Sequence, residues 1–246
     1  MPAAGAPSIN FDHISLHYEG KPLFQNISLE IPGGECTCIL GPSGCGKSTL
    51  LRLITGGETP ADGLVTINGK PPAARTTAWM SQNDLLLPWL CLLDNILLGA
   101  KLRKEETPEL HEQAKHLIRA AGLAGYEKAL PGTLSGGMRQ RGALLRTLME
   151  KRQVVLMDEP FSALDALTRF TLQRLCAELL HKVTVVLVTH DPMEALRMGN
   201  TIIVLSRPPA TVKMILTLAT APPRNPDDQE VQHNLAPLMT KLMKET

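Results

Sequence analysis

A glycine-rich octapeptide constrains this 246-residue chain more than any other feature of its sequence. It reads Gly41-Pro-Ser-Gly-Cys-Gly-Lys-Ser48 and fits the pattern G-x-x-x-x-G-K-[ST]. A short apolar run, residues 36–40, precedes it, and a helix-like apolar stretch, residues 47–54, follows it. In such a strand–loop–helix unit the glycines let backbone N–H groups curl around a phosphate at the positive end of the helix. A chance match in an ordinary turn lacks that context.

The octapeptide and the residue after it supply the predicted phosphate-binding set. We expect Lys47 to reach the β- and γ-phosphates of a nucleotide, and the Ser48 hydroxyl to ligate Mg²⁺. Because Cys45 lies within the loop, its alkylation is expected to block nucleotide binding, and ATP is expected to protect it. The full set is Gly41, Pro42, Ser43, Gly44, Cys45, Gly46, Lys47, Ser48 and Thr49.

The apolar pattern along the chain predicts strands first, then helices, then an alternation of the two. Predicted strands cover residues 9–18, 23–31, 36–40, 64–67, 154–157, 184–188, 201–205 and 212–219. Predicted helices cover residues 47–54, 166–180 and 192–198, and a helical pattern runs from 94 to about 148, with Gly122 and Gly125 ending one helix. Strands that alternate with helices predict a parallel sheet with right-handed crossovers.

One domain, residues 1–246, is expected, with a helical subdomain at about 83–150 and a short helical tail at about 224–246. Val231, Leu235, Leu238 and Leu242 fall near one helical face of the tail. Pro237 either kinks this helix or marks its start.

Composition narrows the classes of function. The net charge of +1 and the aromatic content of 3 % argue against a nucleic-acid partner. No apolar run is long enough to span a bilayer, and the first ten residues have no positive region or apolar core of a secretory signal. The five cysteines form no C-x-x-C pair and are expected to be reduced and mostly buried.

Two consecutive carboxylates follow the predicted strand at 154–157. At the edge of the sheet Asp158 is placed to hold Mg²⁺ through water, and Glu159 to orient and deprotonate an attacking water. An acidic pair after a strand is more often a solvated strand end, but the phosphate loop favours the catalytic interpretation.

A second glycine-rich motif, Leu134-Ser-Gly-Gly-Met-Arg-Gln-Arg141, precedes a helix expected to begin near Met138. Alone, it is also compatible with a flexible turn. With the phosphate loop and the acidic pair it resembles the signature of the ABC (ATP-binding cassette) ATPases, with Met138 in place of the final glutamine. That resemblance implies a head-to-tail homodimer in which Ser135, Gly136 and Gly137 of one subunit face ATP on the other. Gly142, inside the helix, costs about 1 kcal/mol relative to alanine and is expected to loosen it.

Four further residues match the family one by one. Gln82 resembles the glutamine that senses Mg²⁺ and the attacking water, and His190 resembles the switch histidine that contacts the γ-phosphate. Asp165 resembles the aspartate that signals across the dimer, and Tyr18 is the candidate for stacking on adenine. Each residue also has a purely structural interpretation. Gln82 could be a surface glutamine, and His190 could be a structural histidine. Asp165 could be a helix N-cap, and Tyr18 could be a packing residue.

The resemblance, over roughly residues 9–205, implies an α/β P-loop NTPase of ABC type. Its mostly parallel core sheet is joined by an N-terminal antiparallel β subdomain and an α-helical subdomain. It implies an ATPase with ATP and Mg²⁺ as ligands. A single cassette without a membrane domain fits an importer with separate permease subunits and an external solute-binding protein, on the cytoplasmic face of a bacterial or archaeal membrane. The alternative is a soluble ABC ATPase that remodels a protein or nucleic acid.

Residues 83–95 narrow the resemblance further. Their Leu-Pro-Trp and Asp-Asn resemble the nitrate, sulfonate and taurine importers and relatives for the thiamine-precursor hydroxymethylpyrimidine. With Met80-Ser-Gln, residues 148–160 and the short tail, the resemblance leans towards the pyrimidine precursor, so this solute, or else nitrate, a sulfonate or taurine, is expected. Apolar side chains here either form a groove for a permease helix or pack inside the helical subdomain. They are Leu86, Leu87, Pro88 and Trp89.

Overall fold

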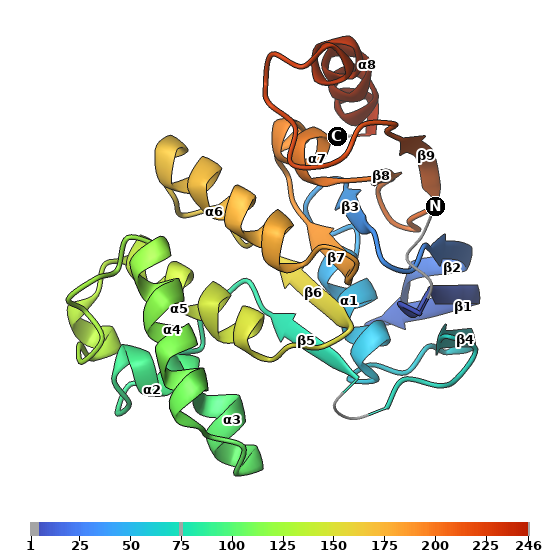
Figure 1. Cartoon of the computed structure of the whole chain (residues 1–246). Helices are drawn as coiled ribbons and strands as arrows, with labels where there is room; N and C mark the ends of the chain where they lie inside the picture. Colours follow the sequence, from blue (N-terminus) through green and yellow to red (C-terminus); the bar gives the residue numbers. More distant parts are fainter. Residues whose placement is uncertain (1–4, 74–75, 246) are drawn as a thin grey trace. The chain divides into compact units, whose positions relative to one another are not determined.

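The computed structural model describes residues 5–73 and 76–245. The first four residues, part of the segment read for a secretory signal, and residue 246 of the tail lie outside this range. The chain divides into two compact units (Figure 1). The first unit contains Met1–Thr77, Arg152–Asp158 and Leu180–Thr246, and the second contains Ala78–Lys151 and Glu159–Leu179.

The first unit contains an antiparallel sheet in the order β2-β1-β4. Its strands are β1 (Ile9–Tyr18), β2 (Lys21–Ile31) and β4 (Asp62–Ile67). Alternate residues of β1, such as Ile9, Phe11, Ile14 and Leu16, are buried, as expected for a sheet with one face against the core. The predicted N-terminal antiparallel subdomain is therefore confirmed.

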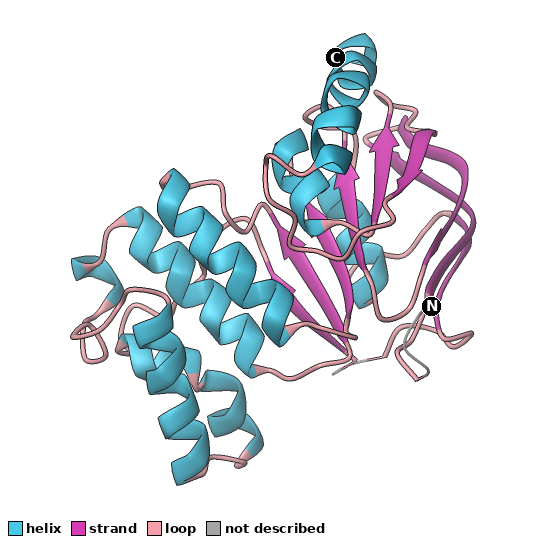
Figure 2. Ribbon diagram, turned by 45° about the horizontal axis from the view of Figure 1, so that its top comes forward, coloured by secondary structure: helices cyan, strands magenta, loops and turns pink. Residues whose placement is uncertain are grey.

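The first unit also contains a mostly parallel sheet, in the order β6-β7-β3-β8-β9 (Figure 2). Its strands are β6 (Val154–Asp158), β7 (Thr184–Val188), β3 (Cys36–Leu40), β8 (Thr201–Leu205) and β9 (Val212–Thr217). Only β9 runs antiparallel to its neighbour. Strands β6, β7 and β8 are buried along their whole length, which explains their continuous apolar sequences. The prediction of a mostly parallel core is confirmed.

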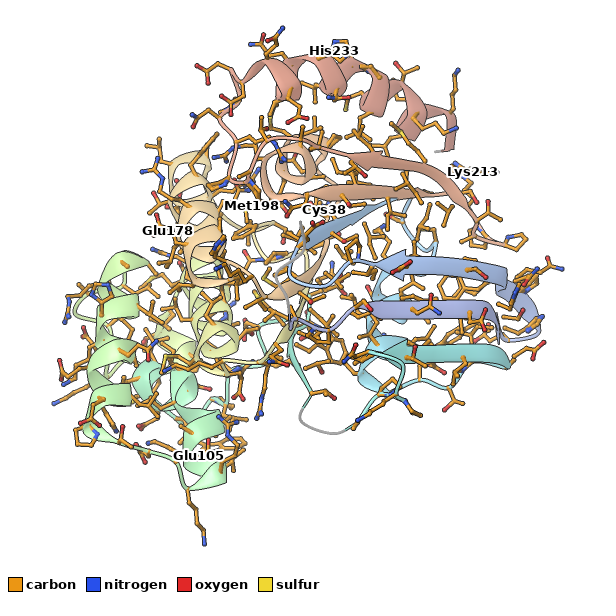
Figure 3. All side chains as sticks on the ribbon, turned by 45° about the vertical axis from the view of Figure 1, so that its right-hand side comes forward. Cys38, Glu105, Glu178, Met198, Lys213 and His233 are labelled. Carbon is orange, nitrogen blue, oxygen red and sulfur yellow. The ribbon has the colours of Figure 1, made fainter. Side chains whose placement is uncertain are left out.

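The first unit also contains helices. They are α1 (Lys47–Thr55), α7 (Pro192–Met198) and α8 (Gln229–Glu245). Helix α1 contacts β4 of one sheet and β6 and β7 of the other, while α7 packs on β3 and α8. Figure 3 shows Cys38 of β3 in the interior and His233 on the outer side of α8. All five cysteines are free, and Cys38, Cys45 and Cys176 are buried.

The C-terminal tail is held by a buried arginine. Arg224 is 1 % exposed and donates to the main-chain oxygens of Leu196 (2.9 Å) and Gly199 (2.6 Å) at the end of α7. Its guanidinium also pairs with the Glu230 carboxylate at 3.3 Å. Helix α8 runs through Pro237, so the alternative that this proline marks the helix start is wrong.

Glu230 should make the stability of the fold dependent on acid pH. Hydrogen bonds from the Thr220 hydroxyl and from the Ala219 and Thr220 N–H groups, with the charge of Arg224, lower the Glu230 pKa from 4.5 to about 2. Because the folded-state pKa lies below the unfolded one, the stabilisation is complete above about pH 5 and is lost as the pH falls towards 2. Glu230→Gln should lower the free energy of unfolding at pH 7 by about 2 kcal/mol. Urea titrations at several pH values should show that the difference in free energy of unfolding between the variant and wild type becomes smaller as the pH falls.

The exposed Asp227 provides the matched control, since Asp227→Asn should leave the free energy of unfolding unchanged. An equal loss for Glu230→Gln at pH 7 and pH 3 would show that the carboxylate charge is not what holds the tail.

The second unit is helical apart from β5 (Thr77–Met80), the strand on which the chain enters it. Its helices are α2 (Leu92–Ile96), α3 (Leu98–Arg103), α4 (Pro108–Ala120), the 3-10 turn Pro131–Thr133, α5 (Gly136–Met149) and α6 (Ala166–Leu179). Gly122, with a φ of 66°, follows the end of α4 as predicted.

Gly142 of α5 has a packing role that the sequence analysis did not foresee. A Cβ at this position would lie 2.7 Å from Leu92 Cδ1 and 3.4 Å from Leu86 Cδ1. The glycine thus allows α5 to approach these two leucines closely. The packing gives the glycine a steric reason, and the expectation that it also loosens the helix stays a prediction.

Candidate functional site

The glycine-rich octapeptide of the first unit forms a tight loop between β3 and α1. The Cys45 N–H donates to the Pro42 oxygen at 3.3 Å, and the Lys47 ammonium donates to the oxygens of Gly41 (2.8 Å) and Pro42 (2.9 Å). No side chain caps the N-terminus of α1, where Gly46 is the N-cap residue. First-turn N–H groups and the helix dipole there favour an anion.

Gly46 is required at its position. Its φ of 98° lies in the left-handed region, and a Cβ would lie 2.5 Å from the Phe24 ring. Phe24 is completely buried in β2, so it has no room to move aside. The antiparallel sheet thus fixes the turn on which Lys47 and Ser48 enter the helix.

Three neighbouring parallel strands bring the other predicted phosphate-site residues of the first unit to the same edge. In register, Ile39 of β3 pairs with Val188 of β7, and Val188 pairs with Asp158 of β6. The carboxyl ends of these strands therefore deliver the phosphate loop, His190 and Asp158 to one edge of the sheet, where ligands of open α/β sheets bind. Asp158 is 4 % exposed, whereas His190 is exposed.

Metal binding at this edge fits the residues present. Among the residues that the structure describes, no group of three or more His, Cys, Asp or Glu side chains could hold a metal. Mg²⁺ commonly binds through one or two protein oxygens together with phosphate oxygens and water. The Ser48 hydroxyl and the Asp158 carboxylate match that donor set.

Cys45 is completely buried, and burial raises the pKa of its thiol. A Cβ on Gly41 would lie 2.9 Å from the Cys45 sulfur, which shows how closely the loop packs on it. Since the thiolate is the reactive form, the buried thiol should react slowly even without nucleotide. The hypothesis that alkylation of Cys45 blocks nucleotide binding and that ATP protects it stays a prediction, and the burial adds that the alkylation should be slow.

Brief maleimide treatment should label the half-buried Cys36 well before Cys45, as followed by peptide mass spectrometry. Equal labelling rates for the two thiols would contradict this prediction.

The second unit presents the other glycine-rich motif at the start of α5. Ser135 is the N-cap, and its hydroxyl accepts from the Met138 N–H at 3.2 Å. The helix begins at Gly136, two residues earlier than expected, because the capping serine ends the preceding loop. Ser135 and Gly136 are exposed and Gly137 is half-buried. This helix N-terminus is thus a second candidate phosphate-binding site.

Glu159 lies on a strained turn of the second unit. Its φ is +51°, which is uncommon for a residue with a Cβ. Its main-chain oxygen accepts from the Gln140 amide at 3.0 Å and from the Ser162 hydroxyl at 3.1 Å. These bonds hold the strained turn and leave the Glu159 side chain half-buried.

Gln140 is a residue that the sequence analysis missed. It is 6 % exposed, donates to the Glu159 oxygen and to the Ser162 hydroxyl (3.1 Å), and accepts from the Ala163 N–H (2.9 Å). It therefore joins the helix that begins at Ser135 to the turn that carries Glu159. Its place in the motif Met-Arg-Gln-Arg was the only signal in the sequence.

The two remaining predicted residues of this unit are exposed. Asp165 accepts from the Thr168 N–H at 3.0 Å, and this bond lowers the Asp165 pKa. Asp165 therefore caps the N-terminus of a helix, which is the structural role that the sequence analysis gave as its alternative, and the residue is exposed. Gln82 follows β5 and is exposed.

A rigid segment follows Gln82, the 84–90 loop. Arg146 of α5 donates to the main-chain oxygens of Asp84 and Leu85, at 2.8 Å each. On its other side the loop is held by the buried Asn95, whose side-chain oxygen accepts from the Leu87 N–H at 2.7 Å. The backbone of the loop is thus fixed from both sides.

The 84–90 loop divides its apolar side chains between interior and surface. Leu86 is 7 % exposed and packs inside, whereas Leu85 is 62 % and Trp89 71 % exposed. Pro88 is exposed as well. Leu86 thus packs inside, as one alternative of the sequence analysis required, while Pro88 and Trp89 are exposed on a fixed backbone. The permease groove stays a prediction.

Comparison with known proteins decides the family. A family model described as "ABC transporter" matches residues 24–162, which include both glycine-rich motifs and the acidic pair. This chain belongs to the ABC transporter family. It is an ATP-binding cassette that hydrolyses ATP.

Similar cassettes extend over nearly the whole chain. An uncharacterized ABC transporter ATP-binding protein of Haemophilus influenzae is 42 % identical over 96 % of this chain and 98 % of its own length. The aliphatic sulfonates import ATP-binding protein SsuB of Bacillus subtilis is 39 % identical over 94 % of this chain and 92 % of its own. The ATP-binding cassette MJ0796, solved as a dimer in a post-hydrolysis state with ADP and Pi, has a TM-score of 0.77 and 30 % identity over 86 % of this chain and 99 % of its own.

The fold class predicted for this ABC cassette is therefore confirmed. Among the described residues, no helix has the length and apolar character needed to cross a membrane.

Proposed function

We propose that this cassette drives import of a solute through permease subunits carried on other chains. The observation that carries the proposal is the 84–90 loop, which holds Pro88 and Trp89 at the surface on a backbone bonded from both sides. An exposed aromatic side chain on a fixed backbone is suited to receive an amphipathic helix of a partner. Several relatives are named as import proteins for aliphatic sulfonates, which supports the direction of transport.

For the solute we propose a small sulfonate. The relatives named for aliphatic sulfonates favour it over nitrate, taurine and hydroxymethylpyrimidine, the other members of the group that residues 83–95 resemble. A solute-binding protein outside the cell would select it, and the cassette would lie on the cytoplasmic face of the membrane. A soluble ATPase that remodels a protein or nucleic acid is not favoured by these relatives.

We propose roles in hydrolysis for the residues that match the family. The loop amides and Lys47 would hold the β- and γ-phosphates, and Tyr18 would stack on the adenine. Glu159 would take a proton from the attacking water. The oxygen of that water would bond to the γ-phosphorus, and the bond from the γ-phosphorus to the bridging oxygen would break, which leaves ADP. Gln82 would orient that water, and His190 would contact the departing phosphate.

Mg²⁺, when bound, would neutralise charge on the phosphates between which the bond breaks. Ser48, Asp158 and Gln82 would hold it. Asp158 is buried at the sheet edge and Ser48 lies in the first turn of α1, so both oxygens are held by regular structure.

Two copies of the chain would enclose two ATP molecules. Ser135, Gly136 and Gly137 of one copy would then supply helix N–H groups to the γ-phosphate bound by the other, and Asp165 would lie near the dimer axis. The dimeric state of the solved cassette MJ0796 supports this arrangement. Binding of ATP would close the pair and move the permease, and hydrolysis would reopen it.

Purification of the tagged chain from gently solubilised membranes of its own cells tests this proposal. Mass spectrometry should find a multi-helix permease with wild type and with Trp79→Ser, but not with Trp89→Ser. Trp79 is a matched control because it is 41 % exposed but lies on β5. Recovery of the wild-type chain alone in the soluble fraction would favour the soluble ATPase instead. A binding protein encoded with the permease, titrated with the candidate solutes, would identify the solute.

A further inference from the structure

The hydroxyl group of Tyr18 is engaged inside the first unit. It donates to the Glu58 carboxylate at 3.2 Å and accepts from the Arg52 guanidinium at 3.3 Å. The ring itself is 45 % exposed at the end of β1. Tyr18 is therefore an accessible ring whose far end is tied to two charged side chains.

One partner of Tyr18 lies in the last turn of α1, and the other lies in the segment just after it. Arg52 is in the last turn, and its main-chain oxygen accepts from the Gly57 N–H at 3.0 Å, which closes the helix after its C-cap Gly56. Glu58 follows directly. The buried residues Leu50, Leu51 and Leu53 anchor this helix in the core, so its C-terminal end is well placed to hold a side chain.

Helix α1 therefore links the phosphate loop at its start with the residues that hold Tyr18 at and beyond its end. Its N-terminus follows the phosphate loop at Lys47, and Arg52 in its last turn and Glu58 beyond it hold the Tyr18 hydroxyl. Without that anchor, Tyr18 would depend on β1 alone, which ends in a turn where Glu19 has a φ of 49°. A ring that is already oriented loses less conformational entropy when a base stacks on it.

We propose that Arg52 and Glu58 are positioning residues that orient the Tyr18 ring for stacking against the nucleobase. The affinity for ATP then depends on the Tyr18 hydroxyl, while the affinity for the phosphates does not. This inference rests on the proposed stacking role of Tyr18.

Binding of two probes to the full-length chain separates the two contributions. Calorimetric titration with ATP measures an affinity to which both the base and the phosphates contribute. Titration with inorganic triphosphate measures the affinity of the phosphate loop alone. Tyr18→Phe and Glu58→Ala should weaken ATP binding roughly three- to tenfold, the cost of one side chain left to be ordered on binding, and leave triphosphate binding unchanged. Glu58→Gln, which keeps an oxygen acceptor, should restore most of the affinity.

Tyr126→Phe is the matched control, because Tyr126 is also 45 % exposed but lies in the second unit. It should leave both affinities unchanged. If Tyr18→Phe weakened the binding of ATP and of triphosphate equally, the inference would be overturned, because the substitution would then have distorted the phosphate loop.

Tyr18→Ala distinguishes failure of the inference from failure of the stacking role. If Tyr18→Ala leaves the ratio of the two affinities unchanged, Tyr18 does not stack on the base, and the proposed role falls together with the inference. If Tyr18→Ala lowers the ratio but Tyr18→Phe and Glu58→Ala do not, the stacking role stands and only the positioning by Arg52 and Glu58 is overturned.

Discussion

Replacing Glu159 with glutamine is expected to slow ATP hydrolysis by a factor of about 10² to 10⁴, the usual contribution of a positioned general base. The amide has the shape of the carboxylate but cannot accept the proton of the attacking water. The bonds from Gln140 and Ser162 go to the main-chain oxygen of Glu159, so the strained turn should persist in the variant. ATP binding should therefore survive, and the ATP-bound dimer should accumulate.

Phosphate release measures the rate, and gel filtration with ATP measures the dimer. Glu178→Gln is the matched control, since Glu178 is an exposed glutamate of the same unit, on α6 (Figure 3). It should hydrolyse ATP at the parental rate. Glu159 is not the general base if Glu159→Gln also keeps the parental rate.

Gln140→Leu is expected to lower both the catalytic rate and the stability of the second unit. Leucine fills a similar volume but removes one of the two side-chain donors to the Glu159 oxygen, which keeps the Ser162 hydroxyl, and removes the side-chain acceptor of the Ala163 N–H. Each of these partly buried hydrogen bonds contributes about 0.5–1.5 kcal/mol. A positive φ at a non-glycine residue costs about 1–3 kcal/mol and persists only where its surroundings hold it. The turn should therefore relax and displace the carboxylate, so that kcat falls at least about tenfold.

Comparison with Gln140→Glu separates positioning from stability. The glutamate variant can still accept from Ala163 N–H but cannot donate to the Glu159 oxygen. If Gln140 positions the turn, kcat should fall in both variants, with little change in the KM for ATP. A fall in melting temperature with an unchanged kcat would show that Gln140 has a structural role alone.

Most of the core sheet was predictable because its strands carry an unambiguous local signal. The apolar runs at 36–40, 184–188 and 201–205 match β3, β7 and β8 at both ends, since each is continuous and bounded by polar or turn residues. The break between α2 and α3 at Leu97 was not predicted, because its neighbours are as apolar as it is and no turn residue marks it.

Burial of individual side chains was less predictable. Leu86 and Trp89 lie in one apolar stretch, yet one is buried and the other is exposed. Cys45 lies in a glycine-rich loop but is buried. Gly142 lies against Leu92 of another helix, and no local sequence pattern predicts this contact. For Leu86 and Gly142 the neighbouring side chain comes from another element, and the side-chain period of a segment does not show which element will cover it.

The sequence by itself determined the chemical groups of this cassette and their order along the chain: the phosphate loop, the second glycine-rich motif, the acidic pair and the histidine. Each consists of neighbouring residues, so local spacing reveals it. Only the tertiary structure decided which side chains hold these groups in place. Gln140 reaches Glu159 across 19 positions and Tyr18 reaches Glu58 across 40, and such contacts depend on how folded elements pack rather than on any repeat in the sequence.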